Sequence, residues 1–139
     1  HPEASLIVCG QRFDRPGLGT LLIEALNELR VVFGGVAFGD QTMFIRRSAL
    51  EASGGFPAQP LMEDVETSLR LAATGRILYL GREWNVSAKK WSGNFPKRFA
   101  LVIRLVATYQ LARLRSPAYA ALVSERMYRD YYPSAPPKG

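Results

Sequence analysis

Apolar residues recur with different periods along the chain, and each period predicts an element. A continuous apolar run at residues 4–13, bounded by polar and turn residues, predicts a buried strand. From Leu18 to Phe33 the apolar residues recur at helical spacing, most polar residues fall outside their stripe, and Gly34 and Gly35 supply a stop. We therefore expect a helix over residues 18–33 that buries Leu18, Leu22, Ala25, Leu26, Leu29 and Phe33.

Shorter elements are expected between residues 42 and 91. Residues 42–46 have the composition of a strand. Ser48 and Glu51 have the spacing of a capping box, which predicts a short helix that begins at Ser48 and stops at Gly54 and Gly55. The remaining expected elements are a helix over 64–74 and strands over 76–80 and 85–91.

The last third of the chain has the spacing of two helices, expected over residues 97–114 and 117–131. Ser116 is the expected N-cap of the second helix and Pro117 its first residue. Strands that alternate with helices and are followed by helices alone predict an α/β fold with a helical C-terminal subdomain. No run reaches the roughly 18 apolar residues that a membrane span needs.

The positive charge is concentrated in the same C-terminal third. The net charge is +6, yet residues 1–96 carry equal numbers of basic and acidic side chains, so residues 97–139 carry the whole excess. We take these two ranges as the expected α/β part and the expected basic, amphipathic helical part with its tail. Such asymmetry suggests an anionic partner, either a membrane surface, a lipid diphosphate or a nucleic acid. A solvated basic face without a partner is an equally good interpretation.

The residue inventory excludes several kinds of chemistry. The chain has one His, one Cys and no pair of carboxylates one residue apart, so we expect no metal site and no Ser-His-Asp triad. Cys9 lies in the first apolar run, which is typical of a buried structural thiol. Gly17 and Gly19 lack the further glycines of a phosphate-binding loop.

Two adjacent carboxylates are the best candidates for chemistry. Glu63 and Asp64 stand at the expected start of the helix over 64–74, after a loop rich in proline and glycine. Free N–H groups and the helix dipole favour an ionised carboxylate there, and such a group near a cleft can accept a proton. Acidic residues are also common in first turns without any catalytic role, and the spacing alone favours that interpretation.

The order and spacing of several short motifs resemble the second half of family 2 glycosyltransferases. Two longer phrases, Pro60-Leu61-Met62-Glu63-Asp64-Val65 and Ser87-Ala88-Lys89-Lys90-Trp91, look like a bacterial subgroup of that family. The resemblance covers about residues 8–132. It rests on Gly39, Phe44, Arg46, Arg47, Gly54, Gly55, Phe56, Glu63, Asp64, Leu69 and Gly75 in this order.

The resemblance implies an inverting transferase of the GT-A fold, with a partial Rossmann-like sheet and flanking helices. Such enzymes displace a nucleoside diphosphate from a sugar in one step, while a carboxylate accepts the proton of the acceptor hydroxyl. Asp64 matches the family's base, with Glu63 beside it. Residues 87–91 differ from the Gln-x-x-Arg-Trp motif of processive members by Ser for Gln and Lys for Arg. The implied substrate contacts are Gly39, Asp40, Gln41, Arg47, Gly54, Gly55, Lys89, Lys90 and Trp91.

The first half of the family, with its donor site and its Asp-x-Asp, has no counterpart in this sequence. We therefore expect a fragment that lacks a complete metal site, is inactive alone and self-associates through unpaired edges of the strand over 6–13. The complete enzyme is expected to use Mg²⁺ or Mn²⁺, a nucleotide-sugar donor and an unidentified acceptor. It is expected in the cytoplasm, where the membrane surface is one candidate resting place. The rival interpretation is a non-catalytic basic module that binds anionic membranes through residues 97–139, with nucleic acid the less favoured ligand.

Overall fold

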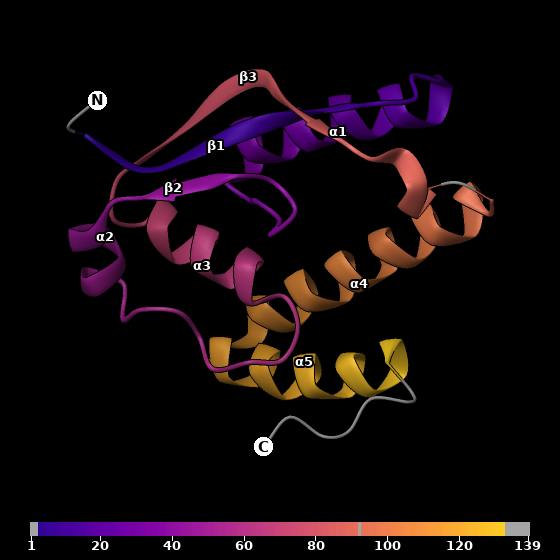
Figure 1. Ribbon diagram of the computed structural model, residues 1–139. Helices are drawn as coiled ribbons and strands as arrows, with labels where there is room; N and C mark the ends of the chain where they lie inside the picture. The colour runs from indigo at the N-terminus through magenta and orange to yellow at the C-terminus, as the bar shows by residue number, and fades with distance from the viewer. Residues whose placement is uncertain (1–2, 92, 133–139) are drawn as a thin grey trace. The chain divides into compact units, whose positions relative to one another are not determined.

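The computed structural model describes residues 3–91 and 93–132, with side chains throughout except those of residues 82, 83 and 90 (Figure 1). The chain forms two compact units. The first comprises residues 1–57 and 64–93 and is mixed α/β, whereas the second comprises residues 58–63 and 94–139 and is helical. The expected α/β class is therefore confirmed.

Three strands form the sheet of the first unit, in the order β2-β1-β3 (Figure 1). β1 (Ala4–Phe13) lies in the centre, antiparallel to β2 (Met43–Ile45) and parallel to β3 (Arg76–Val86). The strands expected over 4–13 and 42–46 are confirmed.

The prediction of two separate strands over 76–80 and 85–91 is wrong, since residues 76–86 form the single strand β3. β3 is one strand because β1 offers a partner along its whole length, from Ala4 opposite Arg76 to Phe13 opposite Val86. The chain then leaves the sheet at the 3₁₀ helix η1 (Ala88–Trp91), where Ala88 N–H donates to Asp14 Oδ1 at 2.7 Å.

The central position of β1 also removes the expected reason for self-association. β3 pairs along the whole of β1 and β2 pairs with Leu6 to Val8, so this part of β1 is not open to another copy on either side. Self-association itself stays a prediction. Between Cys9 and Gln11 the register with β3 shifts, and a Cβ atom at Gly10 would lie 2.0 Å from Gly81 O. Glycine is thus required where the backbones approach so closely.

The core of this unit surrounds β1. Leu6 and Val8 are fully buried, and Cys9 is buried as expected. The other members of the buried cluster are Val31, Ala37, Ala49 and Leu71, contributed by the segments that flank the sheet.

Helix α1 (Leu18–Gly34) has nearly the expected bounds, but it packs on the opposite face. Leu18 and Phe33 are 91% and 82% exposed, whereas Glu24 and Asn27 are buried. The reason is that a backbone N–H group of β1 needs a hydrogen-bond acceptor: Phe13 N–H donates to Glu24 Oε1 at 2.9 Å. The predicted buried stripe is wrong, with Leu22 and Leu29 also exposed and Ala25 and Leu26 only half-buried.

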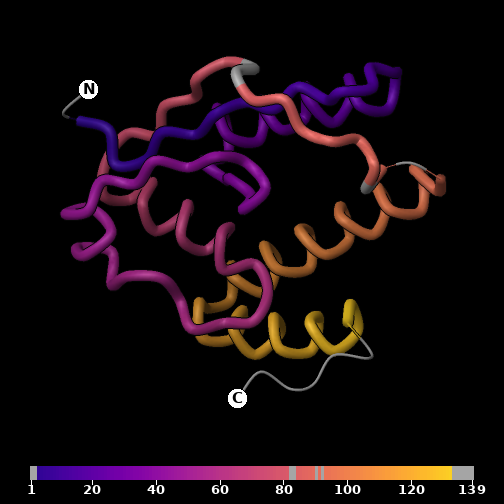
Figure 2. The backbone as a smooth tube through the Cα atoms, viewed as in Figure 1, coloured from indigo at the N-terminus to yellow at the C-terminus, as the bar shows by residue number. Residues whose placement is uncertain are grey.

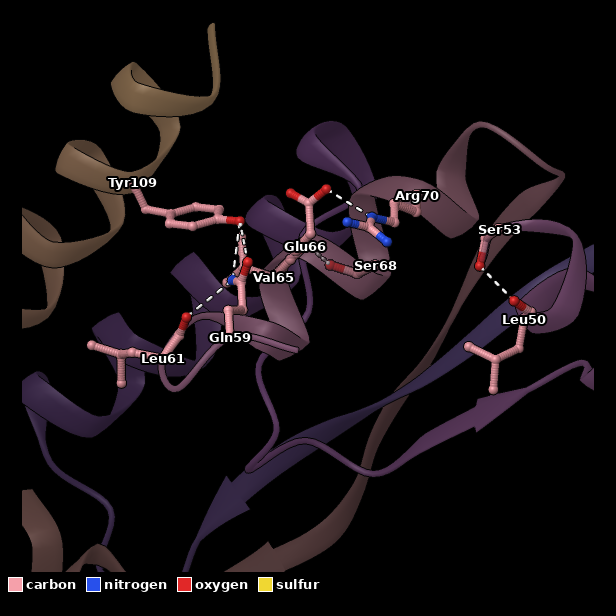
Figure 3. A network of polar contacts seen from close by, with 9 residues as sticks. All are labelled: Leu50, Ser53, Gln59, Leu61, Val65, Glu66, Ser68, Arg70 and Tyr109. Carbon is pink, nitrogen blue, oxygen red and sulfur yellow. Dashed lines mark hydrogen bonds and ion pairs between the residues drawn. The ribbon is translucent and has the colours of Figure 1, made fainter. Parts of the chain in front are cut away.

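The expected capping box at Ser48 is wrong as well. Helix α2 (Arg47–Ala52) begins one residue earlier, and its N-cap residue Arg46 makes no side-chain capping bond. Arg46 is held by the sheet instead, because its N–H donates to Ser5 O at 3.0 Å and its Nε to Ala4 O at 2.8 Å. Helix α3 (Glu63–Ala72) lies near the expected 64–74 and carries an ion pair between the buried Glu66 and the half-buried Arg70, drawn in Figure 3.

The second unit is a helical hairpin, α4 (Phe95–Arg115) and α5 (Pro117–Tyr131), whose backbone is traced in Figure 2. Both helices and the Ser116 cap are confirmed, since Ser116 Oγ accepts from Tyr119 N–H at 3.0 Å. Tyr109 is fully buried, and its hydroxyl lies 3.1 Å from Gln59 Nε2, as Figure 3 shows. Within the described ranges, no helix has the length and apolar character needed to cross a membrane.

Candidate functional site

The sheet has two edges, and the residues predicted to act together are divided between them. The carboxyl ends of the parallel strands β1 and β3 lie at one edge, which is where open α/β sheets bind ligands. Because β2 is antiparallel to β1, the loop before it, residues 39–42, reaches the same edge. Gln11 Nε2 of β1 donates to Asp40 O in a short hydrogen bond that fixes this loop.

The carboxylate of Asp64 lies beside this loop and is partly exposed. Gly39 N–H donates to Oδ2 in a short hydrogen bond, and Val65 N–H donates to Oδ1 at 2.7 Å. A Cβ atom at Gly39 would lie 3.2 Å from Oδ2, so the approach suits glycine. A carboxylate has about four acceptor sites, so these two bonds orient the group and leave it able to accept another hydrogen.

Arg30 of α1 connects the parts of this edge, and the sequence analysis did not select it. Its Nη2 donates to Gln41 Oε1 at 2.7 Å and its Nε to Val36 O at 3.0 Å, while the guanidinium lies 3.3 Å from the centroid of the Phe38 ring. Burial lowers the pKa of Arg30 to about 10, and the nearby carboxylates of Asp40 and Asp64 act in the opposite direction. Arg30 therefore stays cationic at neutral pH.

Gln41 is buried in the centre of this cluster, with 2% of its surface exposed. Its Oε1 accepts from Arg30 and, at 3.2 Å, from Phe38 N–H, which fixes the orientation of the amide. Its Nε2 has no hydrogen-bond partner among the described residues. A buried donor in this state costs about 1–3 kcal/mol of stability.

A polar row on α1 supports the loop from behind. Asn27 Nδ2 donates to Gln11 Oε1 at 3.1 Å, and Gln11 in turn holds Asp40. Glu24, Asn27 and Arg30 are three residues apart, so they share one helix face. In the sequence these three polar residues are visible only as residues that fall outside the apolar stripe expected to be buried.

The remaining predicted residues lie in other elements. Lys89 and Trp91 lie in η1, which follows the carboxyl end of β3; Lys89 is exposed and Trp91 half-buried. Lys90 lies between them, and its side chain is outside the described part. Glu63 is the first residue of α3 and is exposed.

Arg47, Gly54 and Gly55 lie near the opposite edge of the sheet and do not meet Asp64. Arg47 follows the residue that bonds to Ala4 and Ser5, and it pairs with Glu51 at 2.9 Å. Gln11 lies seven positions after Ala4 along β1, which corresponds to about 23 Å of strand. Gly54 and Gly55 adopt φ values of 87° and 77°, which end α2. An open depression of about 330 Å³ at this edge is lined by Glu3, Ala4, Ser5, Arg46, Ser48, Ala49, Ala52 and Thr74, none of them a predicted site residue.

The carboxyl-end cluster, which we define as Arg30, Gly39, Asp40, Gln41 and Asp64, is thus the candidate site. It contains an oriented carboxylate, a half-buried cation and a buried amide. Within residues 3–91 and 93–132, no three His, Cys, Asp or Glu side chains gather where they could hold a metal ion. An oriented carboxylate beside a guanidinium is suited to proton transfer and polar recognition.

Comparisons with known proteins returned no matching family model, no matching curated protein and no matching solved structure.

Proposed function

We propose that this chain supplies the acceptor and general-base half of an inverting glycosyltransferase, with Asp64 as the base. One observation carries the proposal: the Asp64 carboxylate is partly exposed at the carboxyl edge of the sheet and is oriented by two backbone N–H groups. A general base must be held within hydrogen-bond reach of the proton that it accepts.

In this proposal the acceptor hydroxyl donates its proton to Asp64 as its oxygen attacks the sugar. Arg30 keeps a positive charge near the Asp40 and Asp64 carboxylates, which lessens the repulsion between them. Gln41 is 2% exposed, so its part in the proposal is to hold Arg30 through Oε1 beside the site. Glu63 precedes the base in the sequence. In the proposal Lys89 contacts a diphosphate and Trp91 stacks on a sugar ring.

The complete enzyme would take Mg²⁺ or Mn²⁺ and the nucleotide-sugar in the half that precedes this one. The described residues gather no ligand set for such an ion, so the metal belongs to that half in the proposal. A bacterial, cytoplasmic enzyme is the setting that the sequence resemblance implies.

The test is a matched pair of substitutions in a polypeptide that joins this chain to a nucleotide-sugar-binding half. Asp64→Asn preserves shape but cannot accept the proton, so turnover should fall by about 10²–10⁴. Glu63→Gln removes the neighbouring exposed carboxylate and should cost far less. Release of nucleoside diphosphate from uridine and guanosine diphosphate sugars measures turnover, while calorimetry with the same donors shows whether donor binding is intact.

Near-wild-type turnover of Asp64→Asn would contradict the assignment, and equal losses in both variants would mean a shared base. The chain alone should bind none of these donors in the presence of Mg²⁺ or Mn²⁺. Micromolar, metal-dependent binding by the chain alone would contradict the division into halves.

A further inference from the structure

Helix α4 exposes a continuous apolar stripe. Leu111 and Leu114 are 66% and 84% exposed, and Ile103 is 50% exposed. They follow one another at spacings of three or four residues when two exposed alanines are included, so they form one side of the helix. The α4 outer face, as we define it, consists of Ala100, Ile103, Ala107, Leu111 and Leu114.

A row of cations borders this face. Lys97, Arg104 and Arg115 are exposed and lie along the helix at spacings of seven and eleven residues, adjacent to the apolar stripe. α4 contains further basic residues and no acidic one. The opposite side of the helix is used for packing, since Tyr109 and Ala112 are buried.

The neighbouring helix α5 provides an internal contrast. Its exposed side has one exposed leucine, Leu122, among charges of both signs: Arg126 and Arg129 with Glu125 and Asp130. The two helices pack on each other, yet only α4 combines an exposed apolar stripe with charge of a single sign.

We propose that α4 binds an anionic lipid surface, lying in its plane with the α4 outer face in the acyl boundary and the cations at the headgroups. Interfacial helices have this pattern of an apolar face flanked by Lys and Arg. The inference is independent of the chemistry assigned to Asp64.

A lipid surface fits these observations better than a nucleic acid does. Both attract the cations, but only a membrane provides an apolar phase in which Ile103, Leu111 and Leu114 can be buried. The aliphatic stripe has no aromatic residue on which a base could stack.

The first experiment measures partitioning of the chain onto vesicles of phosphatidylcholine with phosphatidylglycerol, and onto phosphatidylcholine alone. Binding is expected only to the anionic vesicles and should weaken as salt is raised. The pair Arg104→Gln and Arg115→Gln should lower the partition coefficient about 30-fold. The pair Arg126→Gln and Arg129→Gln on α5 removes the same charge and should have a much smaller effect. All four arginines are at the surface, so circular dichroism should show unchanged folding.

The second experiment locates the helix face by fluorescence. Leu111→Trp on α4 should shift its emission to the blue and be quenched by brominated lipid, whereas Leu122→Trp on α5 should show neither effect. Trp84 and Trp91 give the same background in both variants. Equal losses from the two arginine pairs, equal binding to neutral vesicles or quenching of both tryptophans would overturn the proposal. The proposal would also be overturned if the chain bound a single-stranded RNA but did not bind anionic vesicles.

Discussion

Helices α1 and α4 both turn apolar side chains to solvent, but they reach this arrangement differently. α1 packs through the apolar Ile23 and Val31 together with polar groups, since Glu24 and Asn27 are buried against β1, while Leu18 and Phe33 are left outside. α4 packs through Tyr109 and Ala112, and its outer apolar face is additional to a conventional buried one.

The difference teaches what an exposed apolar face can and cannot indicate. The exposed apolar face of α1 has no row of cations beside it, because Arg30, the one basic residue of this helix, belongs to the polar row of the candidate site; no charge therefore selects a partner. Around that of α4 the charges have one sign, which selects an anionic surface. The polar side of α1 has instead become part of the candidate site.

The largest effect is expected at the buried side of α1. Glu24→Leu should destabilise the first unit by about 3 kcal/mol, because Phe13 N–H loses a charged acceptor inside the protein. The same change at the half-buried Glu28 should cost much less. Urea denaturation followed by tryptophan fluorescence reports on this unit, which contains both tryptophans. A stabilised Glu24→Leu protein would mean that α1 packs through its leucines after all.

A smaller loss is expected when Arg30 is changed to lysine, which keeps the charge but not the planar group. The bonds to Gln41 and Val36 and the stacking on Phe38 depend on that plane, so Arg30→Lys should cost about 2 kcal/mol. Arg104→Lys on α4 is the matched control and should be neutral, since Arg104 is exposed. If the two variants were equally stable, the assignment of Arg30 to the candidate site would be contradicted. The measurement is again urea denaturation.

Removal of one hydroxyl from the buried side of α4 should lower the free energy of unfolding by about 1 kcal/mol. Tyr109→Phe deletes the contacts with Gln59, at 3.1 and 3.3 Å, without opening a cavity. Tyr119→Phe is the control, since Tyr119 is 38% exposed. Thermal unfolding by far-ultraviolet circular dichroism detects the change. A larger loss in the control would contradict the packing of α4.

The smallest effects belong to the exposed faces. Phe33→Ser on α1 and Leu114→Ser on α4 should each change the unfolding free energy by no more than about 0.5 kcal/mol, because the side chains are 82% and 84% exposed. Only Leu114→Ser should weaken binding to anionic vesicles. A loss of stability above 2 kcal/mol in either variant would show that its face is covered in solution.

Periodicity in the sequence was sufficient to locate most elements, but not the face that each one buries. The helix over 18–33 and the strand over 4–13 are present because their local patterns are strong. The buried side of α1 depends on Phe13 N–H and on Gln11, which are provided by a different element. No local pattern contains that information.

The candidate site was predictable in part for a similar reason. The motif order placed Gly39 and Asp64 in one site, and the structure brings them into hydrogen-bond contact. The motif order also grouped Arg47 and Gly54 with them, although these two residues lie near the other edge. The order of motifs along a sequence contains no information on the distances between them in the fold. Arg30 was missed because a polar residue on an apparently amphipathic helix looks like a solvent-facing one.

Gly10 divides β1 into two lengths, and we expect them to differ in hydrogen-exchange protection. The length before it contains Leu6 and Val8 and belongs to the buried cluster, whereas the length after it pairs with Trp84 to Val86 in a shifted register. Strand segments that share few core contacts open separately from the rest of a protein. The end of the sheet that carries Gln11, and through it the Asp40 loop, can therefore fluctuate on its own timescale while the core stays closed. Hydrogen exchange would record two levels of protection within one strand.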